Sequence, residues 1–154
     1  MQELKLLEKN KDIKNLKVFL RVDFNVPMQN QAVSDSTKIT KVKTIVEDLL
    51  NRGAVVILCS HLGRPQVKGK EGFSLEPIRS EAEKIIGREI VFVPEDFKNI
   101  ISQKISENKK LFLLENIRFD PNEEKNGDEF SKKLADLCDI YINEAFSCSH
   151  RKHA

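Results

Sequence analysis

Asp23 and Asn25 are the first residues of this chain whose types and spacing could bind a ligand. They stand on either side of Phe24, directly after the apolar run at residues 18–22. A carboxylate and an amide at this spacing can hold the hydroxyl and carboxylate groups of a small acid. The alternative is an Asx turn that does no more than close a strand. These residues alone leave both interpretations open.

A second polar cluster, formed by His61, Leu62, Gly63 and Arg64, follows the apolar run at residues 55–59. The arginine supplies a planar fork that fits phosphate oxygens, and the glycine allows the backbone to approach an anion closely. Taken alone, this pattern is explained equally well by a turn that carries an exposed arginine.

Two later apolar runs also end in cations. Arg118 follows residues 111–114, and His150 and Arg151 follow residues 140–142. A single such charge is usually a solvated side chain. In an open parallel sheet, however, ligands bind in the crevice outside the carboxyl ends of the strands. The repeated pattern therefore predicts a basic pocket for a small phosphorylated acid.

No metal site and no known phosphate-binding loop is predicted. The spacing of Cys148, His150 and His153 lacks the second ligand pair that a zinc site requires. The sequence contains neither G-x-x-x-x-G-K-[ST] nor G-x-G-x-x-G, and neither H-E-x-x-H nor G-x-S-x-G. No residue is therefore assigned to a metal or a nucleotide from these patterns.

Apolar, β-branched runs that alternate with helical patterns are expected to position the polar clusters. The runs expected to form strands are residues 18–22, 55–59, 90–93, 111–114 and 140–142. The segments expected to form helices are residues 36–50, 74–86, 96–107 and 128–138. This alternation predicts an α/β fold, a doubly wound parallel sheet with helices on both faces.

Capping residues mark the ends of the first two predicted helices. Ser36 or Thr37 is expected to cap the first helix, and Gly53 is expected to follow its end in the left-handed conformation. Ser74 is expected to begin the second helix and Gly87 to end it.

The composition is that of an ordinary globular protein. The 154 residues, 40% hydrophobic and 32% charged, suffice for one domain with a substantial core. The net charge of +2 gives no strong attraction to nucleic acid or to an anionic membrane. No stretch approaches a membrane span, and the three scattered cysteines are typical of reduced cytosolic thiols. We expect a cytoplasmic protein with neither a nucleic-acid nor a membrane partner.

Taken together, the motifs resemble those of the amino-terminal part of phosphoglycerate kinase. The match is collinear from about Lys17 to the last residue. The segments that carry it are RVDFNVP (21–27), DSTKI (35–39), SHLGRP (60–65), LLENIRF (113–119), EEKN (123–126) and NEAFSCSHRKHA (143–154). Long motifs in a fixed order are far more specific than any single cluster.

The resemblance implies a two-domain enzyme that transfers a phosphoryl group reversibly between 1,3-bisphosphoglycerate and ADP, giving 3-phosphoglycerate and ATP. Asp23 and Asn25 are then expected to hold the hydroxyl and carboxylate end of the glycerate. The residues expected to complete the substrate site, most of them around the non-transferring phosphate, are Phe24, His61, Leu62, Gly63, Arg64, Arg118 and Arg151. Family membership also implies Mg-ADP or Mg-ATP as cofactor, at a site that is not in this chain, and a monomer.

Lys38 departs from the family pattern, which has arginine at this position. The family's arginine resembles a clamp on the substrate carboxylate and on the charge that develops during transfer. Lysine keeps the charge and loses the bidentate fork. Lys38 is therefore the candidate catalytic residue, and we expect it to lower turnover sharply while preserving much of the substrate binding.

The resemblance covers less than half of a family member. Residues 1–154 are expected to form an amino-terminal phosphoglycerate-binding domain, incomplete at its C-terminal end and without the nucleotide-binding domain. By itself this fragment is not expected to be an active kinase. The alternatives are a non-catalytic module that binds 3-phosphoglycerate and a degenerate, truncated product.

Overall fold

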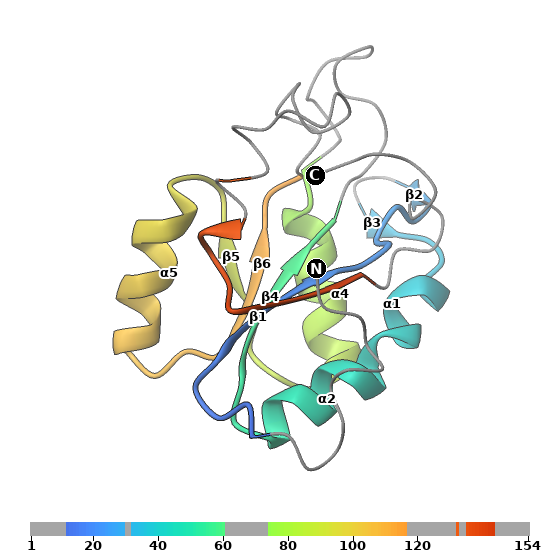
Figure 1. Cartoon of the computed structure of the whole chain (residues 1–154). Helices are drawn as coiled ribbons and strands as arrows, with labels where there is room; N and C mark the ends of the chain where they lie inside the picture. Colours follow the sequence, from blue (N-terminus) through green and yellow to red (C-terminus); the bar gives the residue numbers. More distant parts are fainter. Residues whose placement is uncertain (1–11, 30–31, 61–73, 117–131, 133–134, 144–154) are drawn as a thin grey trace.

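The computed structural model describes residues 12–29, 32–60, 74–116, 132 and 135–143. Its centre is a five-stranded parallel sheet with the strand order β5-β6-β4-β1-β7 (Figure 1). The strands are β1 (Lys17–Arg21), β4 (Val55–Cys59), β5 (Val91–Val93), β6 (Leu111–Leu114) and β7 (Ile140–Asn143). All five predicted strands are confirmed, with ends that differ by one residue at most.

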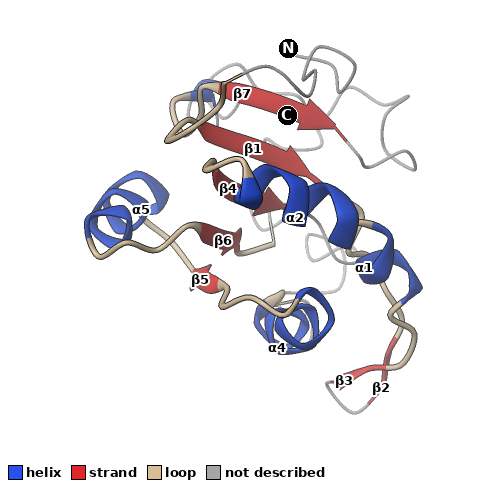
Figure 2. Cartoon of the chain, turned by 90° about the horizontal axis from the view of Figure 1, so that it is seen from below, coloured by secondary structure: helices blue, strands red, loops and turns tan. Residues whose placement is uncertain are grey.

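Helices cover both faces of this sheet, as Figure 2 shows, with α5 on one face and α1, α2 and α4 on the opposite face. The helices whose bounds lie within the described residues are α1 (Thr37–Lys41), α2 (Lys43–Asn51), α4 (Glu76–Ile86) and α5 (Phe97–Ser106). The predicted doubly wound α/β architecture is therefore confirmed.

The sheet separates two hydrophobic cores. Along β1, Val18 and Leu20 face the core under α1, α2 and α4, whereas Phe19 faces the core under α5. Every residue of β4 is buried, because this central strand is covered on both faces. The near-continuous apolar run at residues 55–59 is the sequence pattern of such a strand.

The first predicted helix is in fact two helices. Val42 lies between α1 and α2, and its amide donates to Ile39 O three residues back at 3.2 Å, which tightens the turn there. Ser36 stands at the N-cap position, as expected, but its side chain makes no capping hydrogen bond. Asp35 caps the helix instead, because its Oδ1 accepts hydrogen bonds from Thr37 N at 2.9 Å and from Thr37 Oγ1 at 2.7 Å.

The C-terminal ends of α2 and α4 follow the predictions, whereas α4 begins at Glu76, with Leu75 rather than Ser74 at the N-cap position. Gly53, one residue beyond the C-cap of α2, has φ +86°, and Gly87 at the end of α4 has φ +77°. Ser74 Oγ accepts the amide hydrogen of Glu76 at 3.1 Å, at the start of α4. The helix predicted over residues 128–138 lies largely outside the described residues.

A short antiparallel ribbon, β2 (Met28–Gln29) and β3 (Ala32–Val33), lies between β1 and α1. Within the part of the chain that the structure describes, no helix has the length and apolar character needed to cross a bilayer.

Candidate functional site

The loop after β1 and the residue after β4 emerge at the same edge of the sheet. The two strands are parallel neighbours, with Arg21 opposite Cys59 in the register. Val22 N extends the pairing by donating to Cys59 O at 2.9 Å. Residues 23–25 therefore begin beside Ser60, at the carboxyl edge where ligands of open parallel sheets bind.

Ser60 fixes this loop. The serine is fully buried, and its Oγ accepts the amide hydrogen of Phe24 at 2.8 Å. The Phe24 side chain is also fully buried and packs in the core beneath α1. Phe24 is thus an anchor, and any contact that it makes with a ligand is through its backbone.

Asp23 and Lys38 form an ion pair beside the loop of residues 23–25, with 3.1 Å between Asp23 Oδ2 and Lys38 Nζ. The same ammonium group donates to Asn25 O at 3.1 Å. The Asp23 side chain is 15% exposed and that of Lys38 43% exposed, so both can meet a ligand from solvent.

The Asx turn that the sequence left as an alternative is present. Asp23 Oδ1 accepts from Asn25 N at 3.1 Å, while Oδ2 is paired with Lys38. Turn and site are therefore compatible: one carboxylate shapes the loop and also carries the charge that faces the lysine.

Asp35 caps the first turn of α1, the helix that carries Lys38. The hydrogen bond from Thr37 Oγ1, the bond from Thr37 N and the charge of Lys38 keep the pKa of Asp35 below its ordinary value. A carboxylate at this end of the helix is also favoured by the helix dipole. The start of α1, and with it the Lys38 backbone, is consequently well defined.

Glu115 forms a second connection at the carboxyl edge, immediately after β6. Its Oε2 accepts from Ser74 Oγ at 2.7 Å, and its Oε1 accepts from Leu75 N at 2.9 Å. The Oε1 atom also accepts from Asn116 N at 2.7 Å. Neither Glu115 nor Ser60 was predicted as a site residue, although both stand inside the motifs that carry the resemblance.

The structure brings together four of the predicted site residues, namely Asp23, Phe24, Asn25 and Lys38. The other predicted site residues lie outside the described part of the chain: His61, Leu62, Gly63, Arg64, Arg118 and Arg151. Their contribution to the site stays a prediction from the motifs.

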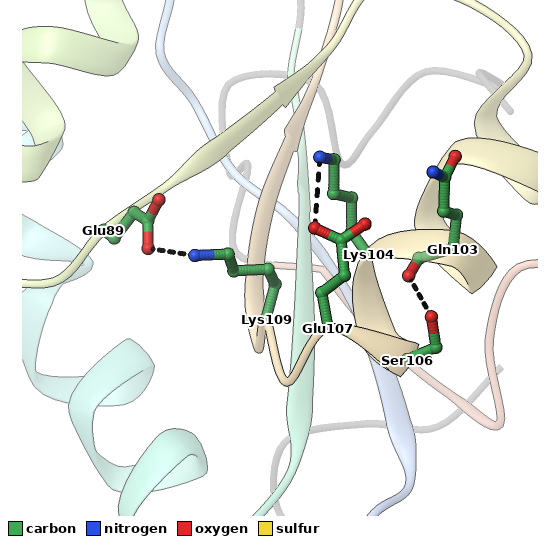
Figure 3. Close-up of polar contacts among 6 residues, drawn as sticks. All are labelled: Glu89, Gln103, Lys104, Ser106, Glu107 and Lys109. Carbon is green, nitrogen blue, oxygen red and sulfur yellow. Dashed lines mark hydrogen bonds and ion pairs between the residues drawn. The ribbon is translucent and has the colours of Figure 1, made fainter.

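A hollow of about 200 Å³ opens at the amino ends of β5 and β6, at the opposite edge of the sheet. An ion pair of 2.9 Å between Lys109 Nζ and Glu89 Oε1 lies at its wall (Figure 3). This hollow is remote from residues 23–25 and takes no part in the candidate site. Among the described residues, no group of three or more His, Cys, Asp or Glu side chains could hold a metal ion.

Comparisons with known proteins find relatives along nearly the whole chain. A family model described as phosphoglycerate kinase matches residues 8–154. The chain is 42% identical over 152 residues to the phosphoglycerate kinase of Thermosipho africanus, covering 97% of this chain and 38% of that protein. It is 45% identical over 146 residues to that of Bartonella quintana, covering 93% and 36%.

Solved structures show the same likeness in three dimensions. Phosphoglycerate kinase from Coxiella burnetii superposes with a TM-score of 0.80 and 27% identity, covering 99% of this chain and 37% of that one. The enzyme from Pyrococcus horikoshii OT3 gives the same score and identity, and the chain covers 38% of it. The chain thus spans little more than a third of the length of each of these relatives.

Proposed function

The chain belongs to the phosphoglycerate kinase family, and on this premise we propose that it binds the glycerate phosphate in a phosphotransferase. The proposed reaction is reversible phosphoryl transfer between 1,3-bisphosphoglycerate and ADP, which gives 3-phosphoglycerate and ATP. Residues 1–154 are assigned to the amino-terminal, phosphoglycerate-binding domain. Substrate binding is the part of the reaction assigned to these residues.

The observation that carries this proposal is the position of the Asp23–Asn25 loop beside Lys38. Ser60 holds the loop at the carboxyl edge of β1, and the carboxylate and ammonium groups are 3.1 Å apart and partly exposed. A hydroxy acid presents a hydroxyl group that can donate to Asp23 and a carboxylate that can pair with Lys38. Asp23 and Lys38 therefore lie close enough together to bind one such ligand.

Phosphoryl transfer depends mainly on positioning and on stabilisation of the charge on the transferring group. Lys38 is proposed to supply one such charge near the acyl phosphate. The phosphate at the other end of the substrate is assigned to His61, Arg64, Arg118 and Arg151. The guanidinium forks of the three arginines suit phosphate oxygens. In the direction of ATP formation, the bond from phosphorus to the acyl oxygen breaks as a terminal oxygen of ADP bonds to that phosphorus.

Family membership implies a magnesium nucleotide. The described residues offer no cluster of three carboxylate, imidazole or thiolate groups, so they do not fit a protein-ligated metal centre. No residue of this chain is assigned to the metal or to the nucleotide, and no step is derived through them.

Titration of the chain with 3-phosphoglycerate, followed by ¹H–¹⁵N NMR, tests the proposal. We expect saturable shifts of the Asp23, Asn25 and Lys38 amides, and weaker binding after Asp23→Asn. Lys41→Gln, which removes an exposed charge from the same helix, is the matched control and should leave the affinity unchanged. An absence of shifts at these amides at millimolar ligand would refute the proposed function.

A further inference from the structure

Lys38 must reach two acceptors that belong to an earlier part of the chain. Its Nζ lies 3.1 Å from Asp23 Oδ2, and it donates to Asn25 O at 3.1 Å across thirteen positions of sequence. A lysine ammonium stands at the end of a flexible four-carbon stem. The stem does not fix the ammonium by itself, so the position of the charge depends on where the Lys38 backbone is held.

The helix that carries Lys38 is too short to hold that backbone on its own. α1 has five residues, whereas an isolated helix needs about 12–15 to be more than marginally stable in water. Ile39 is the one residue of α1 that is buried, and Ser36 at the N-cap position makes no side-chain capping bond. The start of α1 therefore depends on contacts from outside the helix.

Asp35 supplies such contacts directly before the lysine. Its Oδ1 accepts from Thr37 N at 2.9 Å and from Thr37 Oγ1 at 2.7 Å. Hydrogen bonds to an ionised carboxylate are stronger than those between neutral groups. Thr37 is the residue before Lys38, so these two bonds fix the peptide that leads into the lysine.

We propose that Asp35 is a positioning residue for Lys38. By fixing Thr37, its carboxylate keeps the Lys38 backbone where the ammonium reaches the loop of residues 23–25 and a ligand carboxylate bound beside that loop. The ammonium makes the contact with the ligand, and Asp35 acts through it. This role rests on the proposed function, because it requires that the substrate carboxylate pairs with Lys38.

Two substitutions of Asp35 separate positioning from charge. Asp35→Ala removes both the negative charge and the acceptor oxygen. Asp35→Asn also removes the charge, but the amide oxygen of asparagine can still accept from Thr37. Loss of a negative charge near Lys38 would by itself favour an incoming anion. Weaker binding in Asp35→Ala alone is therefore the signature of lost positioning.

Asp96 offers a matched control at the start of another helix. It is exposed, stands at the N-cap position of α5 and accepts from Asn99 Nδ2 at 3.0 Å. Because α5 covers the opposite face of the sheet from α1 (Figure 2), Asp96→Ala removes a helix-start carboxylate on the other side of the molecule.

The test compares the Kd for 3-phosphoglycerate in these variants, measured by ¹H–¹⁵N NMR titration of the chain. Asp35→Ala should raise the Kd about fivefold, because small displacements of a binding group are costly. Asp35→Asn should bind at least as tightly as the unaltered chain, to within about twofold. Asp96→Ala should leave the Kd unchanged, although its urea midpoint falls.

A double-mutant cycle with Lys38→Met distinguishes positioning from a general structural role. Lys38→Met should itself raise the Kd about tenfold, roughly the cost of losing one hydrogen bond to a charged group. Adding Asp35→Ala should then raise the Kd no further, because the group that Asp35 positions is gone. The urea midpoint should still fall on this addition, since the cap of α1 is lost in either background.

Equal Kd values for the unaltered chain and Asp35→Ala would overturn the positioning role and leave the proposed function intact. The role would also be overturned by an equal loss of affinity in Asp35→Asn, in Asp96→Ala or on adding Asp35→Ala to Lys38→Met. An absence of binding by the unaltered chain would overturn the proposed function and this role with it. If Asp35→Ala does not fold, Thr37→Ala decides, with a Kd raised about threefold expected for loss of one bond and an unchanged Kd as the contrary result.

Discussion

Replacing Ser60 by alanine removes the hydroxyl oxygen that accepts the Phe24 amide hydrogen at 2.8 Å. Ser60 and Phe24 are both fully buried, so water does not take over this bond without structural opening. A buried donor left without its acceptor costs about 1–3 kcal/mol. We therefore expect Ser60→Ala to lower the free energy of unfolding by about 2 kcal/mol.

Urea denaturation measures this loss directly. With a slope of about 2 kcal/mol per molar urea, the midpoint should fall by about 1 M at an unchanged slope. Ser80→Ala is the matched control, because Ser80 lies exposed on α4 and should change stability by no more than about 0.5 kcal/mol. Faster hydrogen exchange at the Phe24 amide should accompany the loss.

A midpoint for Ser60→Ala within about 0.2 M of the unaltered chain would refute this reasoning. It would mean that Ser60 does not fix the loop. The argument that Ser60 sets the position of Asp23 and Asn25 would then fail as well.

Three further predictions concern the residues around the site and the helix ends. In a complete enzyme that carries this segment, Lys38→Arg should raise turnover because it restores a bidentate fork, and unchanged turnover in a coupled assay for ATP formation would contradict this. The pKa of Asp35 is below its ordinary value, so its contribution to stability is present above about pH 4 and is lost as the pH falls further. Asp35→Asn should thus show a smaller drop in thermal midpoint between about pH 5 and pH 3, whereas parallel curves would count against the assignment. Gly53→Ala should lower the free energy of unfolding by more than the roughly 1 kcal/mol expected for Gly87→Ala. The reason is that a Cβ at position 53 would meet Lys14 Cγ at 3.0 Å, whereas a Cβ at position 87 would meet no neighbour. Equal urea midpoints for the two variants would show that Lys14 moves aside at no cost.

The strands could be predicted because burial on both faces leaves a direct trace in the sequence. The apolar run at residues 55–59 became β4, which is buried throughout. The break between α1 and α2 left no such trace. Ile39, Val42, Val46 and Leu49 are all buried, so the helical spacing of apolar residues continues across the break. Periodicity alone therefore predicted one helix.

Lys38, which lies in α1, was predicted only through the family resemblance. From local sequence pattern alone, the candidate site was predictable only where its residues directly follow a strand. Asp23 and Asn25 could be found in this way, because a polar pair after a buried run is visible locally. Ser60 and Glu115 act on residues 36 and 40 positions away, and those contacts depend on which strands are neighbours. The order of the strands is set by the packing of the whole sheet, and it could not be predicted from local patterns in a single sequence.

The ion pair between Asp23 and Lys38 affects how strongly the binding of an anion at Lys38 depends on salt. The lysine ammonium already has a carboxylate partner at 3.1 Å and a carbonyl partner at the same distance. An incoming carboxylate that takes Lys38 exchanges one anionic partner for another, so little net charge is neutralised there. Added salt weakens the old pair and the new one alike. The affinity for such a ligand should therefore depend less steeply on ionic strength than the number of cations around it would imply.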